Sequence, residues 1–151
     1  MPYHHGKNLR KGRYSEAGRP YLITTVTSKR KPVFNDLYAG RLLVSEIKKT
    51  VHSCMADTYC FVIMPEHLHW LMTPIDSNLA VIIRQVKSCS AIAINRHIGS
   101  HGSFWQKGYH DHAVRKDEDV RFIARYIVGN PIRAGLVKHI GDYPLWDAIW
   151  L

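Results

Sequence analysis

The stretch of sequence that decides the fold covers residues 62–72 and reads Val-Ile-Met-Pro-Glu-His-Leu-His-Trp-Leu-Met. It is an apolar run that two histidines interrupt at alternating positions. Successive side chains of a β-strand point to opposite faces of the sheet, so His67 and His69 share one face. The other face then carries Leu68, Trp70 and Met72. The pattern predicts a strand with two adjacent imidazoles on one side, although two ordinary histidines on a solvated face would give the same spacing.

The neighbouring segments predict three further strands. Residues 58–64 form a strand, and Pro65-Glu66 is too short for a crossover connection, so residues 67–73 must return antiparallel. Residues 21–27 are β-branched and aromatic and predict an earlier strand. Residues 103–115 are expected to be extended around Gly108 and to supply the last strand or hairpin.

Three apolar stripes with a spacing of three or four residues predict helices. The first helix follows a cap at Asn35 or Asp36, and its stripe consists of Leu43, Val44, Ile47 and Val51. The second follows a cap at Asp76 or Ser77, and its stripe consists of Leu79, Ile82, Val86, Cys89 and Ala93. The third covers residues 117–130, is ended by Pro131, and has a stripe of Val120, Ile123, Ala124 and Ile127.

The resulting order, β-α-β-β-α-β-α, predicts an α+β fold with a ferredoxin-like four-stranded antiparallel sheet and an additional helix. We expect a basic arm, residues 1–19, and a single catalytic domain, residues 20–151. No secretory signal and no apolar run of membrane-spanning length is evident, which favours a cytoplasmic location. The cysteines form no C-x-x-C pair, so we expect reduced thiols that fill the core at Cys54, Cys60 and Cys89.

The positive charge is concentrated at the N-terminal end. The net charge of the chain is +9, and within residues 1–31 the single acid Glu16 stands against Lys7, Arg10, Lys11, Arg13, Arg19, Lys29, Arg30 and Lys31. Tyrosines lie between these cations. Cations that contact phosphates and flat rings that stack on bases together predict nucleic-acid binding. A solvated basic tail and an acidic membrane surface are the alternatives.

The third predicted helix carries a tyrosine outside its apolar stripe. Tyr126 lies to one side of the stripe, and Asn130 follows one turn later on the same side. If this helix lies beside the face that carries His67 and His69, the four side chains converge. Two neutral imidazoles and an oxygen donor suit Mg²⁺ or Mn²⁺, which leave coordination positions for a phosphate and water. A tyrosine nucleophile at such a site would form a covalent phosphotyrosine, and Arg121, Arg125 or Lys116 could help to activate it.

Three segments together resemble the REP-associated tyrosine transposases, bacterial relatives of the single-tyrosine HUH transposases of insertion sequences. They are residues 64–69 (Met-Pro-Glu-His-Leu-His), residues 105–112 (Trp-Gln-Lys-Gly-Tyr-His-Asp-His) and residues 124–137, which begin Ala-Arg-Tyr-Ile-Val-Gly-Asn-Pro. The resemblance implies a ferredoxin-like HUH domain that cuts single-stranded DNA beside a palindromic hairpin and stays attached to the 5′-phosphate.

The same resemblance implies roles for individual residues. His67 and His69 match the metal-binding pair, Tyr126 matches the nucleophile, and Asn130 matches a third ligand that is a glutamine in the insertion-sequence relatives. The basic arm corresponds to the region that grips the hairpin, and such enzymes occur as monomers and as homodimers. A non-catalytic hairpin-binding protein and a metal-dependent hydrolase that uses water are the competing hypotheses.

The remaining candidates are DNA contacts. Trp105, Gln106, His110 and His112 would contact DNA or support the metal ligands, or else form a polar edge strand with a packed tryptophan. The second His-x-His motif, at residues 110–112, could compete for the metal, but its central Asp111 would occupy the face that Leu68 occupies in the first motif. Arg125 is a further candidate, and Arg133 would meet a phosphate or stabilise the end of the tyrosine helix.

Overall fold

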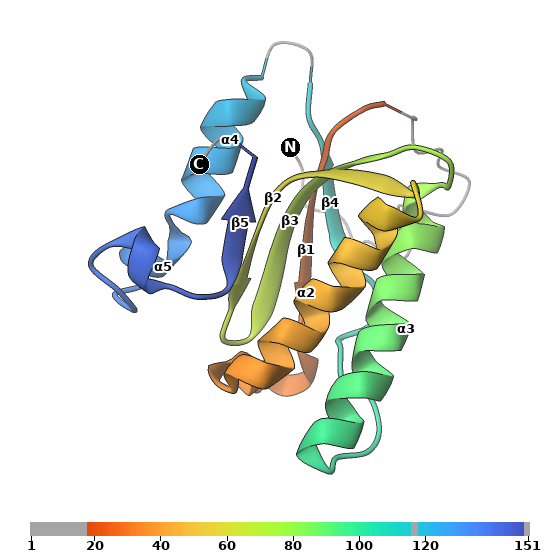
Figure 1. Cartoon of the computed structure of the whole chain (residues 1–151), viewed down its shortest axis with the longest axis vertical. Coiled ribbons are helices and arrows are strands. Elements are labelled where there is room, and N and C mark those ends of the chain that lie inside the picture. Colours follow the sequence, from red (N-terminus) through yellow and green to blue (C-terminus); the bar gives the residue numbers. More distant parts are fainter. Residues whose placement is uncertain (1–17, 116–117, 150–151) are drawn as a thin grey trace.

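A computed structural model describes residues 18–115 and 118–149 of the chain and contains one antiparallel sheet of five strands. The strands are β1 (Tyr21–Val26), β2 (Ala56–Met64), β3 (His67–Pro74), β4 (His110–Ala113) and β5 (Trp146–Ala148). Their order across the sheet is β4-β1-β3-β2-β5 (Figure 1). The first four strands have the ferredoxin-like order, which confirms the predicted α+β fold.

The fifth strand corrects the prediction of a four-stranded sheet. β5 pairs antiparallel with β2, in the register Cys60↔Ala148 and Val62↔Trp146. Ile63 N also donates a hydrogen bond of 2.9 Å to Leu145 O, just before the strand. A strand of three residues is too short to show a periodicity of two in the sequence, so its pairing partner defines it.

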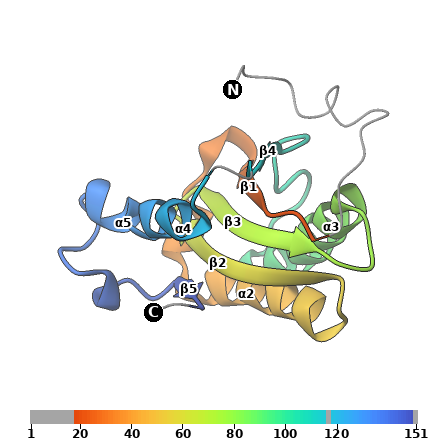
Figure 2. The same ribbon diagram turned by 90° about the horizontal axis from the view of Figure 1, so that it is seen from above.

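Two long helices cover one face of the sheet. α2 (Leu37–His52) and α3 (Leu79–Ile98) pack on the side that carries Leu68, Trp70 and Met72 (Figure 2). The Asp36 side chain caps α2 by accepting hydrogen bonds from the amides of Tyr38 and Ala39. Asn78 caps α3, whereas Asp76 or Ser77 had been expected there.

The buried stripes of these two helices differ in part from the predicted ones. Leu43 and Ile47 of α2 are buried as expected, but Val44 is half-buried and Val51 is 37% exposed, because Ala39 and Thr50 complete the buried face instead. On α3, Ile83, Ser90 and Ile94 are buried, whereas Cys89 is exposed and Ala93 is half-buried. A shift of one residue rotates a helix face by about 100°, so a stripe of mixed small and apolar residues defines the buried face poorly.

The opposite face of the sheet is partly covered by the last helices. α4 (Val120–Val128) packs its Ala124, Ile127 and Val128 against Cys60, Val62, Met64 and Leu71 of the two central strands. Asp119 caps this helix, and Gly129 ends it. Pro131 lies in the first turn of α5 (Asn130–Arg133). The helix predicted over residues 117–130 is thus shorter and ends at Val128, and Pro131 does not end it but lies in the first turn of a second helix, where a proline is tolerated.

The connections include three short 3-10 helices, Ser28–Arg30, Val33–Asn35 and Ile140–Asp142. Within the described parts of the chain, no helix is both long and apolar enough to cross a membrane. The predicted arm, residues 1–19, lies outside the described residues except for Gly18 and Arg19. The Gly18 amide donates a hydrogen bond of 3.0 Å to Pro74 O, so the described chain begins beside the end of β3.

The three cysteines lie in different environments, which corrects the expectation that all of them fill the core. Cys60 is fully buried on β2, whereas Cys54 and Cys89 are exposed at the end of one helix and on the surface of the other. Burial raises the pKa of the Cys60 thiol to about 12, since its thiolate would lose its hydration.

Thiol titration of the native protein should therefore divide the cysteines into two classes. We expect two thiols, Cys54 and Cys89, to react rapidly with a disulfide reagent, and the third to react only when the protein is unfolded. The variant Cys60→Ala should titrate rapidly to the same two equivalents. A third rapid equivalent in the native protein would contradict the burial of Cys60.

Candidate metal and nucleophile site

The hairpin of β2 and β3 places the two histidines on the sheet face opposite α2 and α3. Met64 pairs with His67 and Val62 with His69 across the two-residue turn of Pro65 and Glu66. β1 flanks β3 on its other side, where Thr24 pairs with His69. The prediction that His67 and His69 share the face left free by Leu68, Trp70 and Met72 is confirmed.

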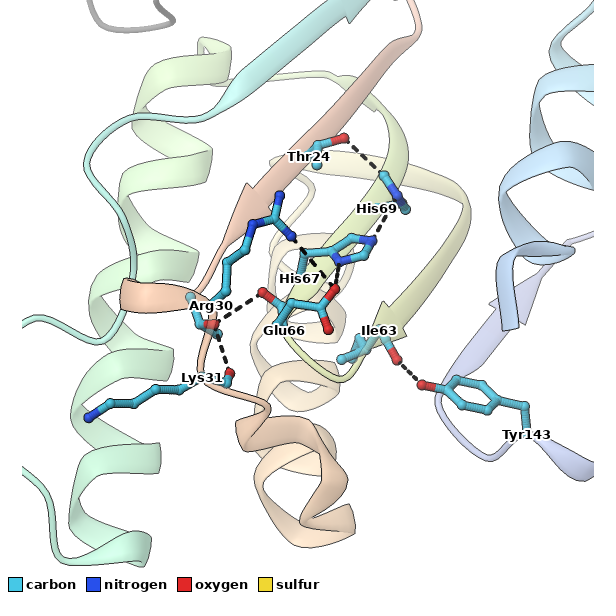
Figure 3. A network of polar contacts seen from close by, with 9 residues as sticks. Thr24, Arg30, Lys31, Ile63, Glu66, His67, His69 and Tyr143 are labelled. Atoms are coloured by element: carbon cyan, nitrogen blue, oxygen red, sulfur yellow. Dashed lines mark hydrogen bonds and ion pairs between the residues drawn. The ribbon is translucent and has the colours of Figure 1, made fainter. Parts of the chain in front are cut away.

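The two imidazoles face each other through the same ring nitrogen. His67 Nε2 lies 3.1 Å from His69 Nε2. Glu66 Oε1 lies 2.7 Å from His67 Nδ1, and Thr24 Oγ1 lies 2.9 Å from His69 Nδ1 (Figure 3). A carboxylate at Nδ1 holds the proton there and leaves Nε2 with a lone pair. The carboxylate and the hydroxyl thus fix both rings and direct both Nε2 atoms to one point.

This arrangement fits a bound cation. Two nitrogen ligands at right angles, each about 2.1 Å from an ion, lie about 3.0 Å apart, which is close to the observed separation. Among residues 18–115 and 118–149, no group of three or more His, Cys, Asp or Glu side chains could hold a metal ion. A closed structural zinc site is therefore not formed by the described residues, and any third protein ligand has to be of another type, such as an amide oxygen.

The protonation of His69 also suits a ligand. Burial lowers the pKa of His69 to about 4, with further lowering by the positive charges of His67 and Arg133. A histidine ligates a metal only in its neutral form. His69 is therefore neutral at physiological pH.

A basic turn lies at the edge of the histidine pair. Lys29, Arg30 and Lys31 are all exposed, and Arg30 Nη1 lies 3.9 Å from Glu66 Oε1 (Figure 3). Lys29 and Arg30 have left-handed φ angles of 57° and 52°. The fully buried Thr27 holds the turn in place by donating to Lys31 O and Glu66 O. Left-handed backbone is uncommon for such residues, so the surrounding hydrogen bonds must impose this conformation.

The nucleophile candidate and the third-ligand candidate are joined to each other by one arginine. Tyr126 is 59% exposed on α4, outside the buried stripe as predicted. The guanidinium carbon of Arg133 lies 3.9 Å from the centroid of the Tyr126 ring. Arg133 Nη2 donates to the backbone oxygen of Tyr126 and to Asn130 Oδ1. In the described chain, neither Tyr126 nor Asn130 forms a hydrogen bond with the histidine pair, and the convergence of all four side chains on one metal site stays a prediction.

The other predicted DNA contacts divide into exposed and buried residues. Gln106, His110 and Arg125 are exposed, and His110 lies opposite Thr24 on the edge strand. Trp105 is only 7% exposed and donates its indole N–H to Ser90 Oγ at 3.1 Å, so it belongs to the core and cannot stack on DNA in this structure. Half-buried His112 lies 3.0 Å from Glu118 Oε1 through its Nε2.

Four of the predicted basic contacts fall on Lys7, Arg10, Lys11 and Arg13, which lie outside the described residues. Arg19 is described, and its Nε donates a hydrogen bond of 3.3 Å to Val114 O. This contact places Arg19 beside Val114, the residue that follows edge strand β4 in the chain.

Sequence reasoning assigned no role to three residues that shape the site. Glu66 stood next to His67 in the sequence, so a carboxylate beside a ligand could have indicated its contact. Thr24 is found only through the β1–β3 register, which one sequence does not give. Gly129 leaves room for Arg133, since a Cβ added there would lie 2.8 Å from Arg133 Nη1.

Comparison with known proteins yields several related chains. A Haemophilus influenzae relative is 28% identical over 138 residues, which cover 84% of this chain and 78% of the relative. A REP-associated tyrosine transposase of Escherichia coli is 25% identical over 133 residues, which cover 87% of this chain and 76% of the relative. A solved structure of a REP-associated tyrosine transposase bound to a REP hairpin has the same fold, with a TM-score of 0.72 at 24% identity over 97% of this chain and 82% of that one.

This chain also matches one protein family directly. The family described as "Transposase IS200 like" matches residues 19–130, which include β1 to β4, both histidines, Tyr126 and Asn130. This match covers well over half of the chain. The protein therefore belongs to the IS200-like transposase family.

Proposed function

We propose that the protein is a metal-dependent enzyme that cuts and rejoins single-stranded DNA beside a hairpin through a covalent phosphotyrosine. The observation that carries this proposal is the pair of Nε2 atoms 3.1 Å apart, with both Nδ1 atoms fixed by Thr24 and Glu66. This pair lies on the same sheet face as α4, which presents an exposed tyrosine. A hairpin-binding protein without catalysis would have no need of two fixed and converging imidazoles.

Tyr126 is the nucleophile of the proposed reaction. Its phenolic oxygen forms a bond to the phosphorus while the bond to the 3′ oxygen breaks. The phenolic proton passes to solvent, and the departing 3′ oxygen takes up a proton. The phosphotyrosine retains the energy of the phosphodiester, so a 3′ hydroxyl can reverse the step and rejoin the strand. An exposed tyrosine at the end of a helix is accessible to a strand of DNA.

His67, His69 and Asn130 are the residues that would hold Mg²⁺ or Mn²⁺. When bound, the cation stabilises the charge that develops on the phosphate oxygens. Glu66 and Thr24 orient the imidazoles, and the neutral form of His69 is available without loss of a proton. Asn130 supplies the amide oxygen that the described acidic and histidine side chains do not provide.

The proposed substrate is hairpin DNA with a single-stranded flank. The hairpin part of this proposal is supported by the relative whose structure was solved bound to a REP hairpin. Exposed Lys29, Arg30 and Lys31 would contact phosphates next to the histidine pair, and Gln106, His110 and Arg125 are further candidates. The basic arm, with Lys7, Arg10, Lys11 and Arg13, would grip the hairpin, in a protein acting in the bacterial cytoplasm as a monomer or a homodimer.

The nucleophile is tested with an adduct assay. Protein, Mn²⁺ and a labelled hairpin oligonucleotide with a single-stranded flank should yield a protein–DNA adduct that resists denaturant, and Tyr126→Phe should form none, because phenylalanine has no oxygen to attack the phosphorus. Tyr38→Phe is a matched control, since Tyr38 is 55% exposed on the opposite side of the sheet and Tyr126 is 59% exposed.

Each alternative function predicts a different outcome of this assay. Undiminished adduct with Tyr126→Phe would show that another residue is the nucleophile. Cleavage without any adduct would indicate a hydrolase that uses water. Binding of the hairpin with neither cleavage nor adduct would indicate a non-catalytic DNA-binding protein and overturn the proposal.

The metal site is tested by the carboxylate that orients it. Glu66→Gln should weaken Mn²⁺ binding by about 10- to 100-fold, because it removes the charged acceptor at His67 Nδ1. Glu118→Gln is the matched control, since Glu118 contacts a histidine of the second His-x-His motif, at Nε2 of His112 and not at Nδ1. Electron paramagnetic resonance of free Mn²⁺ gives both affinities. An effect of Glu118→Gln alone would move the metal to the second motif.

The basic turn is tested by salt dependence. Each phosphate contact contributes about 0.7 to 0.9 to the slope of log K against log salt concentration, so Lys29→Ala with Lys31→Ala should lower the slope by about 1.4 to 1.8. Lys48→Ala with Lys49→Ala removes two exposed lysines from α2, on the other side of the sheet, and should leave the slope unchanged. Equal slopes for all three proteins would exclude the turn from the DNA interface.

A further inference from the structure

Arg133 contacts both Tyr126 and Asn130, the residues proposed as the nucleophile and as the third metal ligand. Its guanidinium stacks on the ring of Tyr126, and the same Nη2 donates to Asn130 Oδ1 and to the backbone oxygen of Tyr126. Asn130 Oδ1 is the atom that would ligate the cation. The arginine thus occupies the proposed ligand atom and holds the ring of the proposed nucleophile at the same time.

The chain leaves space for this contact. Gly129 lies between the two helices, and a Cβ there would come within 2.8 Å of Arg133 Nη1. The backbone of Gly129 is right-handed helical, with φ −74° and ψ −6°, so glycine is not required for its conformation. The absence of a side chain at Gly129 leaves room for the guanidinium of Arg133 at the end of α4.

The charge of Arg133 opposes a cation at the histidine pair. Its guanidinium donates to Asn130 Oδ1, so a cation that reached this oxygen would lie beside a second positive charge. Like charges at such a distance repel each other. A guanidinium is also a preferred bidentate partner of phosphate, and Arg133 is exposed and accessible to one.

We propose that Arg133 is a positioning residue that holds Tyr126 and Asn130 in a resting arrangement, from which a DNA phosphate releases both by binding the guanidinium. The proposal rests on the proposed function, because it takes Asn130 as a ligand and Tyr126 as the nucleophile. Phosphate neutralises the charge that opposes the cation, frees Asn130 Oδ1 for ligation and releases the Tyr126 ring from the guanidinium. Cation binding and the freedom of the Tyr126 ring to move are thereby coupled to the presence of substrate.

Two variants remove the contact in different ways. Arg133→Gln removes the charge and the fork of donors, whereas Gly129→Ala retains the charge and displaces the guanidinium through its new Cβ. Without DNA, both should bind Mn²⁺ about tenfold more tightly than the wild type, the ratio expected when one charge-assisted hydrogen bond no longer competes for the ligand oxygen. Arg84→Gln, which removes an exposed cation from α3 on the other side of the sheet, should not change the affinity.

The gain must depend on Asn130. In an Asn130→Ala background, Gly129→Ala should give no gain, since the freed oxygen is absent and the charge is retained, and Arg133→Gln should keep only the gain that comes from the loss of its charge. A gain of Gly129→Ala that persists there, or a gain of Arg133→Gln without any gain of Gly129→Ala, would show that Arg133 does not act by occupying Asn130 and would overturn the proposal. Equal affinities of the wild type and both variants would overturn it as well.

The release by phosphate is tested with DNA that cannot be cleaved. In a Tyr126→Phe background with bound hairpin oligonucleotide, the difference in Mn²⁺ affinity between the protein that retains Arg133 and the Arg133→Gln variant should disappear. A difference that persists would show that DNA does not release the arrangement. If the wild type binds no Mn²⁺ and forms no adduct, the proposed function itself fails; if it does both while the variants match it, only the role of Arg133 fails.

Discussion

The register between β2 and β3 is the constraint on which the candidate site depends. The two-residue turn of Pro65 and Glu66 pairs Met64 with His67, and the pairs as far as Cys60 with Leu71 follow from that one, before the register shifts between Thr58 and Cys60. A slip of one residue would turn both histidines into the core formed with α2 and α3 and would expose Trp70. The register that buries Leu68, Trp70 and Met72 therefore also places both imidazoles on the opposite face. Glu66 is placed by the turn itself, so one local structure supplies two rings and the carboxylate that orients one of them.

The second half of the site is positioned by packing that involves neither histidine. α4 is held by Ala124, Ile127 and Val128 against apolar residues of β2 and β3, and this contact fixes the direction in which Tyr126 points. β5 adds to the same apolar cluster through Ala148. The apolar residues that hold α4 on the sheet and the tyrosine proposed as the nucleophile thus lie on different sides of the helix. Tyr126 can be exposed without loss of the apolar burial that holds α4 in place.

The sequence was sufficient wherever a strict periodicity acted on a long element. The alternation across residues 67–72 assigned both faces of β3 correctly, and the stripe of α4 left Tyr126 outside the core, as found. The sequence was insufficient where the structure of a segment depends on the segment that it pairs with or packs against. β5 is defined by β2, and Trp105 is buried against Phe34 and Phe104, with its indole N–H bonded to Ser90 of α3. Pro131 can end one helix or begin another, and only the packing of α5 shows which.

The charges around the histidine pair favour a cation and a phosphate together over a cation alone. His69 is neutral at physiological pH, because burial lowers its pKa to about 4. Arg30 Nη1 lies 3.9 Å from Glu66 Oε1 on one side, and the charge of Arg133 contributes to the low pKa of His69. Under the proposed function, a divalent ion at the histidine pair would be repelled by these arginines. A phosphate that contacts the arginines would remove that repulsion and add oxygen ligands, so the proposed ion and the proposed DNA strand would each favour the binding of the other.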